Sequence, residues 1–145
     1  MIPRWHIVLG GLFTGLIYLS APQINSIYLA LVFFSSFLID IDHYIVSVIR
    51  TRKLRLKHSF KYHEEATKQE IRDIKRGIKK RGDFHLLHTI EFHILIGILS
   101  IFFTAFFYIF IGMVFHSLTD LFYLFYVKRF HRREFFFFNW LRKRF

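Results

Sequence analysis

The sequence predicts an all-α protein that crosses a membrane with four helices, and two observations lead to this prediction. All 21 Lys and Arg residues of the 145-residue chain occur at Arg4, in residues 50–81 and in residues 128–144. The stretches between these positions are apolar, and about 20 apolar residues are enough for one helix to cross the hydrocarbon core of a bilayer. The length favours a single membrane domain, residues 1–145.

The first apolar run predicts a helix over residues 5–21, and Pro22 ends it in a short neutral turn. We expect this helix to be retained, because no small-residue cleavage site of a signal peptide follows it. The second run predicts a helix over residues 27–49, and this helix contains the motif Asp40-Ile-Asp42-His43.

Residues 50–83 form a strongly basic segment, which we interpret as a cytoplasmic loop. Helix-forming residues from Glu64 to Lys80, with sparse isoleucines, predict a weakly amphipathic helix at the membrane surface. The tail, residues 128–145, mixes aromatic and basic side chains and is typical of an interfacial anchor. The net charge of +11 therefore favours anionic lipid headgroups as partners, and no nucleic acid is expected.

Residues 84–127 form an apolar run that is too long for a single helix crossing the membrane. A straight helix of this length would measure about 66 Å, against a hydrocarbon thickness of about 30 Å. We therefore expect a hairpin of two helices, residues 84–102 and 105–127, with its turn between Ser100 and Ala105. Both flanks of the hairpin are basic, so both should be cytoplasmic, together with both termini of the chain.

Acidic residues and histidines gather in three of the four predicted helices. Ionisable groups inside a membrane are costly and mark functional sites. If the helices end at their basic flanks, these groups lie in one layer about 7 to 17 Å from the cytoplasmic end. Carboxylate and imidazole ligands favour one or two divalent ions, with zinc expected first and iron or manganese as alternatives. The candidate metal ligands are Asp40, Asp42, His43, His88, His93, His116 and Asp120. His6 in the first helix is interpreted as a packing residue.

Asp40 and Asp42 lie about 200° apart on a straight helix. Either the helix is distorted there, or the two carboxylates serve different ions, or one of them only orients another ligand. A metal-activated water would need a proton acceptor, for which Glu91 and Asp42 are the candidate catalytic residues.

The order of these motifs resembles the membrane-bound metal-dependent hydrolases. The resemblance is carried by Asp40, Asp42 and His43, then by the pair His88 and His93, then by His116 and Asp120. That family is described as LexA-binding, inner-membrane-associated hydrolases and is distantly similar to zinc-dependent phospholipase C. The resemblance implies a hydrolase of the inner membrane that acts on a phosphoester or other ester of a lipid-like substrate.

The chain departs from the family pattern at two places. Ile39 stands where the family has Pro before the first Asp. The residues between His88 and His93 read Thr-Ile-Glu-Phe, without the Arg-Gly that the family carries there.

Two other functions use the same residues. The chain could be a non-enzymatic membrane protein that binds or conducts metal ions, although the predicted outer half holds no polar groups beyond Ser, Thr and Tyr. It could instead be an adaptor that binds a partner through the basic loop, with the His and Asp cluster only joining helices by hydrogen bonds.

Overall fold

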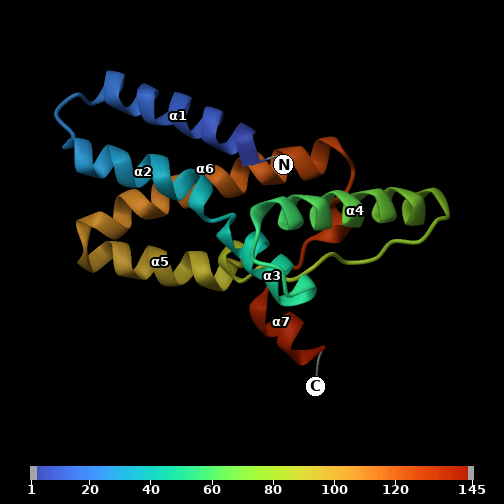
Figure 1. Ribbon diagram of the computed structural model, residues 1–145. Helices are drawn as coiled ribbons and strands as arrows, with labels where there is room; N and C mark the ends of the chain where they lie inside the picture. Colours follow the sequence, from blue (N-terminus) through green and yellow to red (C-terminus); the bar gives the residue numbers. More distant parts are fainter. Residues whose placement is uncertain (1–2, 144–145) are drawn as a thin grey trace.

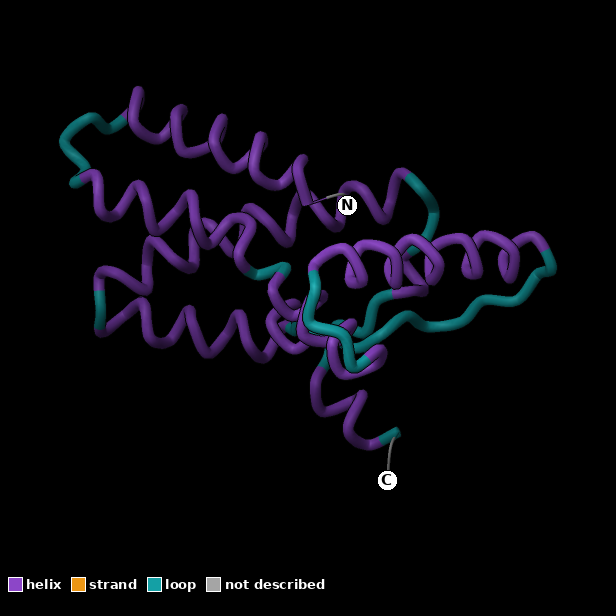
Figure 2. Tube along the Cα trace, viewed as in Figure 1, coloured by secondary structure: helices purple, strands orange, loops and turns teal. Residues whose placement is uncertain are grey.

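The computed structural model describes residues 3–143, and these residues form helices and loops without a strand, which confirms the all-α class (Figures 1 and 2). The helices are α1 (Pro3–Ser20), α2 (Ser26–Leu38), α3 (Ile41–Thr51), α4 (Leu56–Lys75), α5 (Ile90–Phe102), α6 (Thr104–Tyr126) and α7 (Phe137–Arg142), with 3₁₀ turns η1 (Leu86–His88) and η2 (Phe130–Arg132).

Helix α6 packs against α1, α2 and α5, so it lies at the centre of a four-helix arrangement. The α1–α2 turn and the α5–α6 turn lie at the same end of these helices (Figure 1). At the opposite end, α2 leads into α3, and η1 leads into α5 (Figure 1). The polar motifs at the α2–α3 junction and in η1 therefore lie at this end of the helices, where they meet the middle of α6.

Two helical segments are long and apolar enough to cross a membrane, Ser26–Thr51 and Thr104–Tyr126. Helix α5 is a shorter apolar helix, Ile90–Phe102. The turn between α5 and α6 is at Phe103, inside the predicted interval, and Phe103 has the extended backbone angles φ −133° and ψ 116°. Helix α5 begins six residues later than position 84, because Thr89 acts as its N-cap and accepts a hydrogen bond from the Phe92 backbone N–H.

The helix predicted over residues 27–49 is broken between α2 and α3. At the break, the Asp40 N–H donates to the Phe37 carbonyl at 3.2 Å, as in a tight turn. The hydroxyls of Ser35 and Ser36 donate to the carbonyls of Leu31 (2.7 Å) and Phe33 (2.6 Å) one turn earlier. Hydrogen bonds from a hydroxyl to a carbonyl one turn earlier compete with the hydrogen bonds of the helix backbone and bend helices, which favours a break at this position.

The basic segment contains a longer and earlier helix than predicted, since α4 spans Leu56–Lys75. Gly77, with a φ of 75°, follows its end and adopts the left-handed conformation that glycine tolerates. Helix α4 packs against α3. The Tyr62 hydroxyl donates to Asp83 at 2.6 Å, and burial together with this bond raises the pKa of Tyr62 to about 12. This contact joins α4 to the returning loop.

Helices α2 and α6 approach closely at Gly112. A Cβ atom at this position would overlap the Ser35 hydroxyl and the Val32 backbone carbonyl. A small residue therefore allows the two backbones to pack together, as is common between membrane helices. Gly15 in α1 has nothing within 4 Å of an added Cβ.

We expect Gly112→Ala to destabilise the protein by about 1–3 kcal/mol, because the added methyl group meets backbone that cannot move without separating α2 from α6. Gly15→Ala is the matched control and should be neutral or stabilising by up to about 1 kcal/mol, since Ala favours helix over Gly. Thermal melting in detergent micelles measures both, and equal melting temperatures for the two variants would contradict the close packing at Gly112.

Candidate metal centre

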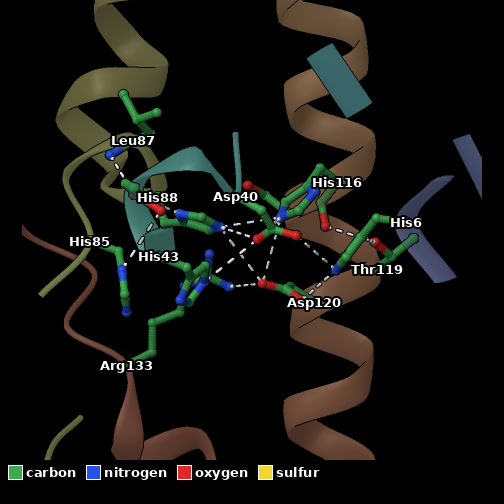
Figure 3. Close-up of polar contacts among 12 residues, drawn as sticks. His6, Asp40, His43, His85, Leu87, His88, His116, Thr119, Asp120 and Arg133 are labelled. Atoms are coloured by element: carbon green, nitrogen blue, oxygen red, sulfur yellow. Dashed lines mark hydrogen bonds and ion pairs between the residues drawn. The ribbon is translucent and has the colours of Figure 1, made fainter. Parts of the chain in front are cut away.

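Two buried imidazoles face each other where η1 meets α6. The Nε2 atoms of His88 and His116 lie 3.2 Å apart. His116 has an exposed fraction of 0% and His88 one of 5%. Figure 3 shows both rings pointing toward the same point between the helices.

In both rings the second nitrogen, Nδ1, donates a hydrogen bond. The Nδ1–H of His116 donates to the Ser36 backbone carbonyl at 2.8 Å. The Nδ1–H of His88 donates to Asp42 Oδ2 at 3.0 Å, and this oxygen also accepts from the Leu87 backbone N–H at 3.1 Å. Two neutral rings held this way direct two lone pairs at each other, so their contact is favourable only with a proton or a cation between them.

Two carboxylates surround the same point. Asp40 Oδ1 lies 3.5 Å from His116 Nε2 and 3.6 Å from His88 Nε2. Asp120 Oδ2 lies 3.7 Å from His116 Nε2 and 3.9 Å from His88 Nε2. A tetrahedral zinc site with bonds of about 2.0–2.1 Å separates its donor atoms by about 3.3 Å, so these distances suit a metal ion after small shifts.

A second group of ligands lies beside the first. Asp42, His43 and His85 each bring one possible ligand atom within 4.8 Å of the others. His85 Nδ1 lies 3.6 Å from Asp42 Oδ1, and both atoms are buried without a hydrogen-bond partner among residues 3–143. The His43 ring is adjacent, with its centroid 3.7 Å from that of His85. Asp42 thus orients His88 with one oxygen and offers the other to a second ion.

The break between α2 and α3 brings both carboxylates to His88. Asp42 meets one ring nitrogen of His88 and Asp40 faces the other, which a straight helix would prevent because the two residues would lie about 200° apart. The same break explains the position of His116. Ser36 is in the last turn of α2, where carbonyls lack helical partners, and its carbonyl accepts from His116 instead.

His6 of α1 belongs to this cluster, which differs from its interpretation as a packing residue. Its Nε2–H donates to Asp120 Oδ1 at 3.1 Å, and its ring stacks on His116 with centroids 3.9 Å apart. His6, Asp40 and His116 form a further group of possible metal ligands. His6 is the single histidine of the first apolar run and lies near the predicted cytoplasmic end of its helix, on the same side of the membrane as the others.

The C-terminal tail also reaches the cluster. Arg133 Nη1 lies 3.3 Å from Asp120 Oδ2, and the Arg133 side chain is only 11% exposed. Burial lowers the pKa of Arg133, while the nearby carboxylate of Asp120 opposes this effect, and a guanidinium stays charged at neutral pH. The expectation that the tail serves only as an interfacial anchor missed this ion pair, because no spacing pattern links residue 133 to residue 120.

The structure does not bring His93 and Glu91 into the cluster. The His93 Nδ1–H donates to the Thr89 carbonyl and its Nε2 accepts from the Ser117 hydroxyl, both at 2.8 Å. The Glu91 carboxylate accepts from the backbone N–H groups of Phe137 (2.9 Å) and Phe138 (3.3 Å). His93 therefore connects α5 to α6, and Glu91 holds the start of α7. Neither belongs to a group of possible metal ligands among the described residues.

No protein-family model, curated protein or solved structure matches this chain. The site is therefore interpreted from its own geometry.

We expect Glu91→Gln to lower stability by about 1 kcal/mol, because a neutral amide replaces the carboxylate that accepts two backbone N–H groups of α7. The metal content of the protein should not change. Glu65→Gln on the exposed surface of α4 is the control and should melt like the wild type. Loss of bound metal in Glu91→Gln, at wild-type stability, would instead place Glu91 in the metal centre.

Proposed function

We propose that the chain is an integral protein of the cytoplasmic (inner) membrane with four crossings, α1, α2–α3, α5 and α6, and with both termini and α4 in the cytoplasm. The distribution of side chains supports this proposal. Among the described residues, four hydrophobic side chains are buried, against ten polar or charged ones. Large apolar side chains face outward, such as Leu19 (77% exposed) and Phe125 (77% exposed). This distribution suits an apolar solvent, and large exposed apolar surfaces are rare on soluble monomers.

We further propose a divalent cation bound by His88 Nε2, His116 Nε2, Asp40 Oδ1 and Asp120 Oδ2. The observation that carries this proposal is the pair of facing Nε2 atoms, 3.2 Å apart, whose Nδ1 atoms both donate elsewhere. Two imidazoles with two carboxylates favour zinc, with iron or manganese as alternatives. A second ion would be bound by Asp42, His43 and His85.

We propose that the centre hydrolyses an ester of a lipid-like molecule, either a phosphoester or a carboxylic ester. A divalent ion there would supply Lewis-acid chemistry, polarising the ester oxygen and increasing the acidity of water. The residues of the chain have distinct tasks. Asp42 and the Ser36 carbonyl orient His88 and His116, while His6 holds Asp120. Of the residues that carry the resemblance to membrane-bound metal-dependent hydrolases, all except His93 lie in this cluster.

Elemental analysis of the detergent-purified protein tests the metal centre. We expect at least one equivalent of a divalent metal in the wild type and a loss of most of it in His116→Ala. Loss of a residue that only orients a ligand already lowers metal affinity by about 10–100-fold, and loss of a ligand should cost at least as much. Hydrolysis of lipid phosphoesters and carboxylic esters in mixed micelles should disappear in the same variant.

His93→Ala is the matched control, because both nitrogens of His93 are bonded away from the cluster. It should keep its metal although it melts at a lower temperature. Equal metal contents in His116→Ala and the wild type would exclude the proposed ligands. Full metal occupancy without turnover of any ester would leave a metal-binding protein that is not a hydrolase.

A further inference from the structure

Arg133 has more hydrogen-bonding capacity than the structure uses. A guanidinium carries five N–H donors, and its fork geometry suits two oxygens of one anion. One nitrogen, Nη1, contacts Asp120 Oδ2 at 3.3 Å. The other, Nη2, is buried and has no hydrogen-bond partner among residues 3–143. A buried donor without a partner is costly, so a ligand that accepts from it would be bound favourably.

The position of Arg133 is set by the backbone of the tail. The Ile90 N–H at the start of α5 donates to the Phe135 carbonyl at 2.9 Å. This bond places residues 133–135 beside the metal centre, and Figure 3 shows the Arg133 side chain extending from the tail toward Asp120. The guanidinium therefore contacts the same Asp120 oxygen that faces His88 and His116.

Arg133 is also one of the residues that line an apolar cavity of about 310 Å³. It lies between α5 and α6, and Arg133 and His88 contribute to its lining. Two further polar residues, His93 and Ser117, line it and hydrogen-bond to each other. The rest of the lining is apolar and includes Ile94, Gly97, Phe110, Leu121 and Phe135. The accessible wall of the cavity is almost entirely apolar and suits a hydrocarbon chain, while Arg133 lies in that wall with its Nη2 atom covered.

We propose that Arg133 binds the phosphoryl group of the substrate and that the cavity between α5 and α6 holds its hydrocarbon chain. This inference rests on the proposed hydrolase function and narrows its substrate class to lipid-like phosphoesters. A carboxylic ester is neutral and would not compensate a buried guanidinium, whereas a phosphoester is anionic and offers several acceptor oxygens. One phosphoryl oxygen would face the ion, and another would accept from Nη2.

Anion binding at constant metal content tests this inference. The probes are dodecyl phosphate and inorganic phosphate, titrated into zinc-loaded protein in a neutral detergent. We expect the wild type to bind dodecyl phosphate at least about tenfold more tightly than inorganic phosphate, because only the former fills the apolar cavity. Arg133→Gln should weaken the binding of both probes by about tenfold or more, since charge-assisted hydrogen bonds are lost.

Three further variants make the result decisive. Arg142→Gln removes an exposed charge from the same tail and should leave both affinities unchanged. Arg133→Lys keeps the positive charge beside Asp120 but loses the fork, so it should retain the metal and bind phosphate more weakly than the wild type. Gly97→Val reduces the volume of the cavity, because Gly97 lies against Phe110 in the cavity lining. This variant should weaken the binding of dodecyl phosphate without affecting the binding of inorganic phosphate.

Wild-type phosphate affinity in Arg133→Gln or in Arg133→Lys, at full metal content, would overturn the inference and leave Arg133 as a residue that only positions Asp120. If Arg133→Gln loses its metal, the phosphate affinity of Arg133→Lys, compared with that of the wild type, decides whether Arg133 binds the phosphoryl group. Equal affinities of the wild type for the two probes would overturn the assignment of the cavity. Because metal content is measured separately, a failure of the metal centre itself would be recognised independently of these outcomes.

Discussion

The arrangement of this protein depends on two imidazoles whose Nδ1–H groups are both engaged, so that their Nε2 lone pairs face each other. His116 is held by a carbonyl at the end of α2, and His88 is held by Asp42 at the start of α3. Each bond joins a different helix to the cluster. The break between α2 and α3, the close approach of α2 to α6 at Gly112 and the turn η1 together position the two rings, whose Nε2 atoms lie 3.2 Å apart.

The polarity of the interior follows from the surroundings that we propose for the helices. In an apolar solvent, burial of hydrophobic side chains gives little driving force, and helices associate through close packing and hydrogen bonds. The described residues fit this principle, because serine, threonine, histidine and aspartate side chains dominate the buried set. A polar interior also makes a metal centre easier to build, since the ligands at the same time join the helices. Four separate elements contribute to it, α1, η1, α6 and the α2–α3 turn.

Composition and spacing predicted the helical class, the hairpin turn near Phe103 and the clustering of Asp40, Asp42, His43, His88, His116 and Asp120. These features depend on hydrophobic length and on depth along a helix, both of which a linear sequence contains. The roles of His6, Arg133 and Glu91 depend on contacts between residues 46 to 114 positions apart or on the path of the tail. No local period encodes such contacts. A distorted helix at Asp40 was one of the possibilities that the sequence left open. Ser35 and Ser36, whose hydroxyls bond to backbone carbonyls one turn earlier, are the local feature that favours it.

X-ray absorption spectroscopy of the zinc-loaded protein tests the central claim most directly, because it reports the atoms bound to the ion. The proposed centre predicts nitrogen and oxygen neighbours of the ion at about 2.0–2.1 Å, with the multiple-scattering pattern of two imidazoles. His88→Ala and His116→Ala should each remove one imidazole from that pattern. A shell without imidazole, or one unchanged in both variants, would contradict the account, because the facing nitrogens of His88 and His116 would then share only a proton.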